Sequence, residues 1–245
     1  MAPPSILVVQ NAQWEGPGLI EECASVVGLD LAIARMFHRQ GSIPLERLEK
    51  GGFVAVVGLG SPSTAYLPET NPNHHDLVEL FKQTRRRKIP SFNVCYSMQL
   101  FSIVHGGKVA KNPAGKEVGL YKVTPSREAE SEPVLGGMGP FVTLQWHGDI
   151  VERLPPGSVH LASSEKTENQ VAVLDGIHYL FQGDGQAATP RMVRMWLRRD
   201  GKWAREGTGL DGSRLLADVG AHEAYLRNTY IRIFSNFLGL VLSYS

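Results

Sequence analysis

The feature that most constrains the fold is an alternation, over the first 105 residues, of short apolar runs with longer amphipathic segments. The short runs end in turn-forming residues, as buried strands do, and occupy residues 6–9, 30–36, 53–57 and 91–95. The segments between them carry apolar residues at helical spacing, at 18–27, 75–87 and 98–105. Strands that alternate with helices in this way predict an α/β fold with a mostly parallel open sheet and helices on both faces.

The second half of the chain has a different pattern. Five apolar runs follow one another with few helical segments between them, at residues 118–123, 141–146, 159–162, 170–173 and 178–181. They predict an antiparallel or mixed extension of the sheet. Residues 231–242 are apolar but too short to span a bilayer, and we expect a docking helix there. A single domain over residues 1–245 is the simplest organisation for a chain of this length.

Composition excludes several function classes. Charged residues make up 20% of the chain and the formal net charge is +1, so neither nucleic acid nor a membrane is an expected partner. The basic run at residues 85–88 is expected to be a solvated helix end. Cys23 and Cys95 are the two cysteines, and neither has a zinc-like spacing, so no metal and no cofactor is predicted. The N-terminus lacks the features of a signal peptide, and we expect a cytoplasmic protein.

Cys95 ends the fourth predicted strand and directly precedes a helix. In open α/β sheets, ligands bind at the carboxyl ends of the strands. A cysteine on such a strand-to-helix turn is exposed at that edge, and the first amides of the helix can stabilise a thiolate or an oxyanion. The alternative is that Cys95 is simply a small hydrophobic residue at a strand end.

The sequence around Cys95 favours the first interpretation. Residues 89–100 read Ile-Pro-Ser-Phe-Asn-Val-Cys-Tyr-Ser-Met-Gln-Leu, and Gly-Gly-Lys-Val follows at 106–109. Further motifs are Glu-Val-Gly at 117–119, Trp-His-Gly-Asp at 146–149, Leu-Pro-Pro-Gly at 154–157 and Asn-Gln at 169–170. In this order, over about residues 5–190, they resemble class I glutamine amidotransferases, especially the stand-alone members similar to GMP synthetase. The resemblance implies a flavodoxin-like sheet.

The resemblance also implies roles for individual residues. Cys95 would attack a side-chain amide of glutamine, or a γ-glutamyl amide, and pass through an oxyanion to a thioester. The Tyr96 amide would be one oxyanion donor, and the second would come from either Leu59 or Gly60, of which we favour Gly60. The positions that would hold the substrate are Gln99, His147, Gly148 and Asp149.

The chain departs from the family pattern where the general base belongs. The family has Phe-His-Pro-Glu, whereas this chain has Phe181-Gln182-Gly183-Asp184. A glutamine side chain cannot take up a proton near neutral pH, so Gln182 cannot activate a thiol, and about 10²–10⁴-fold of acid–base assistance is lost. Asn93 and Ser97 also replace the two glycines that flank the cysteine, although both residue types tolerate turns.

Three hypotheses follow. The first is a Cys95-dependent enzyme with altered chemistry, which transfers an acyl group or cleaves an amide or thioester of a small glutamyl-like or activated acyl substrate. A synthetase or an acceptor protein would be its partner. The second is an inactive pseudo-glutaminase that serves as a binding or regulatory subunit. The third, a nucleotide-binding Rossmann fold suggested by Gly58-Leu59-Gly60, is disfavoured because the third glycine of that motif is missing. We prefer the first.

Overall fold

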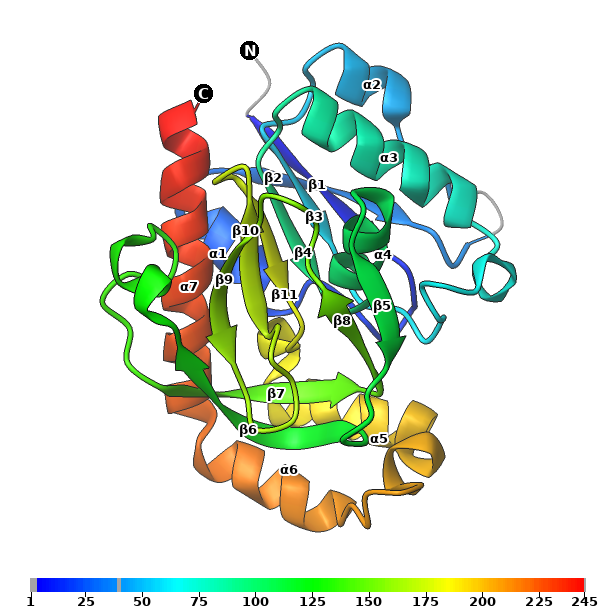
Figure 1. Cartoon of the computed structure of the whole chain (residues 1–245), viewed down its shortest axis with the longest axis vertical. Helices are drawn as coiled ribbons and strands as arrows, with labels where there is room; N and C mark the ends of the chain where they lie inside the picture. Colours follow the sequence, from blue (N-terminus) through cyan, green and yellow to red (C-terminus); the bar gives the residue numbers. More distant parts are fainter. Residues whose placement is uncertain (1–3, 39–40, 245) are drawn as a thin grey trace.

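A nine-stranded sheet forms the centre of the molecule in the computed structural model, which describes residues 4–38 and 41–244 (Figure 1). The strand order is β2-β1-β3-β4-β11-β10-β9-β6-β7. The strands are β1 (Ser5–Gln10), β2 (Asp30–Arg35), β3 (Ala55–Gly58), β4 (Ser91–Val94), β6 (Glu117–Pro125), β7 (Phe141–His147), β9 (Val159–Ser163), β10 (Val171–Leu174) and β11 (His178–Phe181). A separate antiparallel pair consists of β5 (Lys108–Lys111) and β8 (Asp149–Arg153).

The sheet has a parallel half and an antiparallel half. Strands β2, β1, β3, β4 and β11 are paired in parallel, whereas β11-β10-β9-β6-β7 are joined by antiparallel pairs. The predicted fold class, a mostly parallel sheet with an antiparallel extension, is therefore confirmed. The boundary between the halves is β11, which returns the chain from the extension to lie beside β4.

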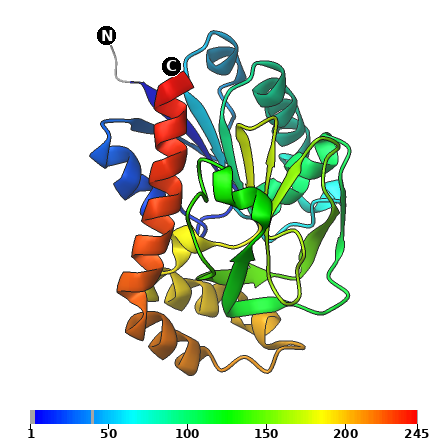
Figure 2. The ribbon, with the colours of Figure 1, turned by 60° about the vertical axis from the view of Figure 1, so that its left-hand side comes forward.

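Helices cover both faces of the parallel half. Helices α1 (Leu19–Val26) and α7 (Glu223–Tyr244) pack together on one face, and α2 (Leu45–Glu49), α3 (His74–Arg86) and α4 (Tyr96–Val104) lie on the other (Figures 1 and 2). Alternate residues of β1 serve the two faces, since Ile6 and Val8 pack with the α1–α7 side while Leu7 and Val9 pack with the α3–α4 side. This two-sided burial explains why the parallel strands are continuously apolar.

Three helices, α2 and two further ones, were absent from the sequence predictions. Helices α5 (Pro190–Arg205) and α6 (Gly212–Ala221) cover strands β6 and β7 at the end of the molecule opposite α2 (Figure 1). Helix α7 includes the predicted segment 231–242 but is longer. Across the described ranges, no helix is both long and apolar enough to cross a bilayer.

Aromatic side chains join β4 and β11 to α7. Phe92 of β4 stacks on Phe181 of β11 with ring centroids 4.5 Å apart, and both rings are buried. Phe234 and Phe237 of α7 contact the Phe92 ring at 5.2 and 5.3 Å. These ring contacts hold β4 and β11 side by side against α7, so the carboxyl ends of the two strands lie together.

Candidate active site

Cys95 sits on a strained turn between β4 and α4. Its φ of 51° and ψ of −113° lie outside the regions that L-residues normally occupy, and such a conformation costs about 1–3 kcal/mol. The Cys95 amide donates a 2.7 Å hydrogen bond to the Phe181 carbonyl, and the Cys95 carbonyl accepts from Gln99. The side chain is 8% exposed. This is the geometry of a nucleophile elbow, with the N-terminus of α4 directly behind the sulfur.

Ser97 fits the elbow because the facing residue of β3 has no side chain. A Cβ on Gly58 would lie 2.6 Å from both the Cβ and the Oγ of Ser97. The Ser97 hydroxyl donates a 2.6 Å hydrogen bond to the Leu59 carbonyl. The serine that replaces a family glycine is therefore accommodated, and it ties the first turn of α4 to the loop after β3.

The hydrogen bonds of that loop discriminate between the two candidates for the second oxyanion donor. The Leu59 amide already donates to the Val9 carbonyl at 3.1 Å and so belongs to the sheet. The Gly60 amide has no such bond within the described part of the chain, which leaves it as the better candidate. The Tyr96 amide lowers the pKa of the Cys95 thiol, as the first amide of α4 should.

Gln182 lies beside Cys95, at the position where the sequence resemblance predicts the family's general base. Because Phe181 is paired in parallel register with Val94, the next residues of the two strands, Gln182 and Cys95, emerge side by side at the carboxyl edge. The Gln182 side chain is fully buried, and its Oε1 accepts from the Gln99 Nε2 at 3.4 Å. Its Nε2 has no partner within the described residues. An amide here can position a neighbouring group but cannot transfer a proton.

Two carboxyl groups lie near this edge. Asp184 is buried, and a Cβ on Gly60 would lie 3.7 Å from its Oδ1. Glu15, in the loop between β1 and α1, has its carboxylate in direct contact with the same Cβ position. Burial raises the pKa of Asp184 to about 8. Burial, followed by the charges of Asp184 and Asp200, raises the pKa of Glu15 well above its usual value.

Sequence reasoning named Asp184 but missed Glu15. The available signal was that Glu15 lies in the loop after a parallel strand, at the edge where this fold binds ligands. Its loop is anchored by α5, which the sequence did not predict. The Trp14 indole donates to Asp200 at 3.0 Å, and the Trp196 indole donates to the Trp14 carbonyl at 2.8 Å.

Asp184 and Glu15 both affect the pKa of the Cys95 thiol. Burial, followed by the charges of Asp184 and Glu15, raises the pKa of the Cys95 thiol well above its usual value, while the Tyr96 amide opposes the rise. Cys95 is therefore a neutral thiol at neutral pH. The elbow has the geometry of a cysteine nucleophile without the positive partner that usually generates a thiolate.

The predicted substrate-binding positions lie close together. The Gln99 side chain donates to the Asp149 carbonyl at 3.0 Å, and the His147 Nδ1 lies 3.1 Å from the same oxygen. The Gly148 carbonyl accepts from the Asn112 amide at 2.8 Å. The Asp149 carboxylate accepts from the Tyr66 hydroxyl at 3.4 Å, and burial raises its pKa. The structure thus brings these four residues together at the turn between β7 and β8.

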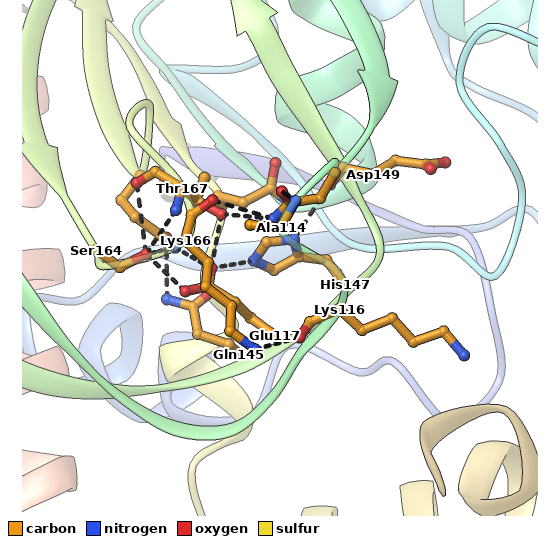
Figure 3. Close-up of polar contacts among 12 residues, drawn as sticks. Ala114, Lys116, Glu117, Gln145, His147, Asp149, Ser164, Lys166 and Thr167 are labelled. Carbon is orange, nitrogen blue, oxygen red and sulfur yellow. Dashed lines mark hydrogen bonds and ion pairs between the residues drawn. The ribbon is translucent and has the colours of Figure 1, made fainter. Parts of the chain in front are cut away.

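His147 belongs to a buried polar network centred on Glu117 (Figure 3). The His147 Nε2 lies 3.1 Å from the Glu117 carboxylate, and both side chains are at most 1% exposed. That carboxylate also accepts from three other side chains, those of Ser164 at 2.6 Å, Thr167 at 2.8 Å and Gln170 at 2.7 Å. Burial alone would raise the pKa of Glu117, but the neighbouring His147 ring and the hydrogen bonds from Ser164 and Thr167 outweigh it and lower the pKa. The His147 Nε2 faces the Glu117 carboxylate, and its Nδ1 lies against the Asp149 carbonyl.

The network reaches the residues around the missing base. Gln170 accepts a 2.9 Å hydrogen bond from the Gln145 side chain. A Cβ on Gly183 would lie 2.7 Å from the Gln145 Nε2, so the glycine between Gln182 and Asp184 allows this close approach. The described residues contain no group of three or more His, Cys, Asp or Glu side chains arranged to hold a metal ion.

Comparison with known proteins agrees with this geometry. The family model "Glutamine amidotransferase class-I" matches residues 35–176, more than half of the chain. The chain belongs to the class I glutamine amidotransferase family. The matched region contains the Cys95 elbow and ends before Gln182. Members of this family use a cysteine nucleophile to hydrolyse glutamine.

Relatives and solved structures show how far the likeness extends. A glutamine-hydrolysing GMP synthase subunit from Ignicoccus hospitalis is 30% identical over 57% of this chain and 70% of its own length. The GMP synthase of Christiangramia forsetii is 32% identical over 51% of this chain, but the match spans only 23% of that protein. The match to the corresponding GMP synthase subunit of Natronomonas pharaonis spans 41% of that relative. A glutamine amidotransferase structure from Methylobacillus flagellatus matches 97% of this chain and 95% of its own with a TM-score of 0.85 and 23% identity.

Replacing the central carboxylate of the buried network tests its contribution to stability. Glu117→Gln should lower the free energy of unfolding by about 3 kcal/mol at pH 7, because the variant loses charge-assisted hydrogen bonds in a buried site. The folded-state pKa of Glu117 is below the unfolded value of about 4.3, so this stabilisation is present above that pH and is lost as the pH falls through the folded pKa. The difference in unfolding free energy between wild type and variant should therefore shrink below about pH 4.

Urea unfolding from pH 3 to 8 measures this difference, with the exposed Glu165→Gln as control. An equal effect of both variants at every pH would contradict it.

Proposed function

We propose that the chain is a Cys95-dependent enzyme that transfers an acyl group, or cleaves an amide or thioester, on a glutamyl-like or activated acyl substrate. The observation that carries this proposal is the strained backbone of Cys95, held by the Phe181 carbonyl and followed directly by the Tyr96 amide at the start of α4. Strain of this kind persists only where the surrounding structure enforces it, and it is concentrated at functional sites. Because two of the relatives are named as subunits of a GMP synthase, we propose a synthetase or acceptor protein as partner.

Gln182 makes ordinary glutamine hydrolysis a poor reaction for this site. An amide substrate needs a proton for its departing nitrogen, and Gln182 cannot supply one. A thiolate or another good leaving group departs without protonation. With Gln182 beside Cys95, the site therefore favours activated acyl donors over glutamine.

We assign the remaining proton transfers to the carboxyl groups of Asp184 and Glu15, which together hold one proton. The Cys95 thiol gives its hydrogen to the ionised carboxylate of the pair, and the sulfur bonds to the acyl carbon as the leaving group departs. Water or another acceptor then attacks the thioester and regenerates the thiol. An oxyanion beside Gly60 would be repelled by two carboxylates, so the pair must retain a proton, and the raised pKa of Asp184 is consistent with this.

Mass spectrometry of the intact protein tests the function. Incubation with γ-glutamyl thioesters or with an electrophilic glutamine analogue should add one acyl mass to the wild type. Cys95→Ala should remain unmodified, whereas Cys23→Ala should react as the wild type does, because Cys23 is buried on α1. A wild type that acquires no adduct, or an equal adduct on Cys95→Ala, would rule out cysteine acyl chemistry at this elbow.

The acid pair is expected to have opposite effects on two reactions of Cys95. Glu15→Gln and Asp184→Asn should each accelerate alkylation by iodoacetamide, because removing a negative charge lowers the pKa of the thiol. Each should slow acyl transfer by about tenfold to a hundredfold, since proton transfer is impaired. Acyl transfer by the wild type should also decline above about pH 8 as Asp184 ionises.

The exposed Glu21→Gln is the matched control for the acid pair and should change neither rate. Acyl transfer that stays at the wild-type rate in both variants would exclude the pair from catalysis. It would leave the role of Cys95 to be decided by the adduct measurement.

An inactive pseudo-glutaminase is the second candidate, favoured by the neutral, largely buried thiol and by Gln182. Gln182→His distinguishes between the two, because the register of β11 and β4 places residue 182 beside Cys95. We expect glutaminase activity to rise at least about tenfold over the wild type in an ammonia-release assay. Gln182→Asn is the control and should give no gain. If Gln182→His also gives none and the wild type forms no adduct, the binding role is the correct one.

A further inference from the structure

A cavity lies at the opposite end of β4 from Cys95. It has a volume of about 660 Å³ and is bordered by the end of α3, the end of α4, the β10–β11 turn and the last turn of α7. Its lining includes four basic side chains and one acidic one. The basic residues are Lys82, Arg85, Arg86 and Lys88. Its volume is typical of small-molecule sites, which span about 300–1,000 Å³.

The basic residues are only partly neutralised by the protein. Arg85 pairs with the Asp175 carboxylate at 2.8 Å, and Arg86 donates one hydrogen bond to Gln83. Lys82 and Lys88 are exposed, and neither has an ion pair among the residues that the structure describes. The predicted solvated helix end is thus one wall of a concave, positively charged site.

Lys88 holds a backbone conformation that normally favours glycine. Its φ is 54°, two residues after the end of α3, where the Lys88 amide donates to the Arg85 carbonyl and the Ile89 amide to the Thr84 carbonyl. A lysine there costs about 1 kcal/mol relative to glycine. This conformation ends α3 next to the cavity, and the Lys88 side chain lines the cavity wall.

The floor of the cavity contains a buried histidine with an unpaired nitrogen. His178 lines the cavity, is 0% exposed, and its Nε2 has no hydrogen-bond partner in the described part of the chain. Its Nδ1 lies 3.0 Å from the Ser91 hydroxyl, which itself accepts from the Asn93 side chain at 3.0 Å. The Ser91 hydrogen is therefore free to be donated to Nδ1.

This chain of hydrogen bonds accommodates a His178 ring that carries its hydrogen on Nε2. Burial lowers the pKa of His178 to about 4, so the ring is neutral at pH 7 and has one N–H group. In the tautomer in which Ser91 donates to Nδ1, that hydrogen is on Nε2. An unpaired buried donor costs about 1–3 kcal/mol, and an acceptor that reaches Nε2 once the side chains covering the ring move aside would recover this energy.

We propose that this cavity binds a small phosphorylated molecule, whose phosphate oxygens accept from the His178 Nε2 and are neutralised by Lys88 and Arg86. Phosphate oxygens satisfy a neutral N–H donor and cationic groups together. The cavity ends at the buried His178 ring, so it suits a small ligand rather than a nucleic-acid duplex. The net charge of +1 also provides no electrostatic field that would attract nucleic acid. The Tyr244 ring on the cavity wall offers an apolar surface to the organic part of the ligand.

Isothermal titration calorimetry of the full chain with pyrophosphate, AMP and adenosine tests this site. Pyrophosphate and AMP should bind saturably, and adenosine should not. Tighter binding of AMP would indicate a nucleotide-type ligand, whereas tighter binding of pyrophosphate would indicate recognition of the phosphates alone.

Lys88→Gln should weaken pyrophosphate binding by about tenfold, the effect of one charge-assisted contact. Arg87→Gln is the matched control because it removes the same charge from the same run, but Arg87 is bonded to the Glu49 carbonyl and does not line the cavity.

Nuclear magnetic resonance of the wild type gives a second measurement that depends on no variant. The ¹⁵N and ¹H signals of the His178 Nε2–H group should shift as pyrophosphate is added, with the same dissociation constant as the calorimetry. His178→Phe should weaken binding at least about fivefold while thermal unfolding confirms that it is folded. The proposal is overturned if no phosphate-bearing probe saturates, if adenosine binds as well as AMP, or if Arg87→Gln weakens binding as much as Lys88→Gln does.

Discussion

The parallel pairing of β4 with β11 is the interaction on which the rest of the site depends. Its last hydrogen bond, from the Cys95 amide to the Phe181 carbonyl, connects the elbow to the strand that carries Gln182 and Asp184. The stacked rings of Phe92 and Phe181 support the same pair from within the core. Since β11 arrives from the antiparallel half, the site exists only when the distant second half of the chain has folded back.

The electrostatics of the site oppose a resting thiolate. A carboxyl pair and deep burial surround Cys95, and no cation among the described residues lies among the groups that shift its pKa. Such a site holds the nucleophile as a neutral thiol, and the mechanism that we propose relies on proton transfer at the moment of reaction. In that proposal, Gln182 in place of the family's histidine and the nearby Glu15 together make the pocket acidic.

The two ends of β4 are chemically connected. Asn93 donates both to the Ser91 hydroxyl and to the Tyr179 carbonyl. The residue two positions before Cys95 thus also contacts the serine that lies beside His178. A single strand of four residues contributes to the candidate active site at its carboxyl end and to the phosphate cavity at its amino end.

The sequence by itself determined the order of the strands and of the longer helices in the parallel half, the elbow at Cys95 and the glutamine at position 182. These features are local: strand and helix periods are visible in a few residues, and an elbow lies between two adjacent elements. The sequence did not reveal α2, α5 and α6 or the position of Glu15, and it favoured Gly60 over Leu59 without the hydrogen bond that distinguishes their amides. Only the tertiary structure shows that Glu15 lies in a loop that Trp196 and Asp200 hold from 180 or more residues away, and that the Leu59 amide already donates to β1. Contacts between residues so far apart in the chain leave no periodic signal, and they form only when the strands have taken their order in the sheet.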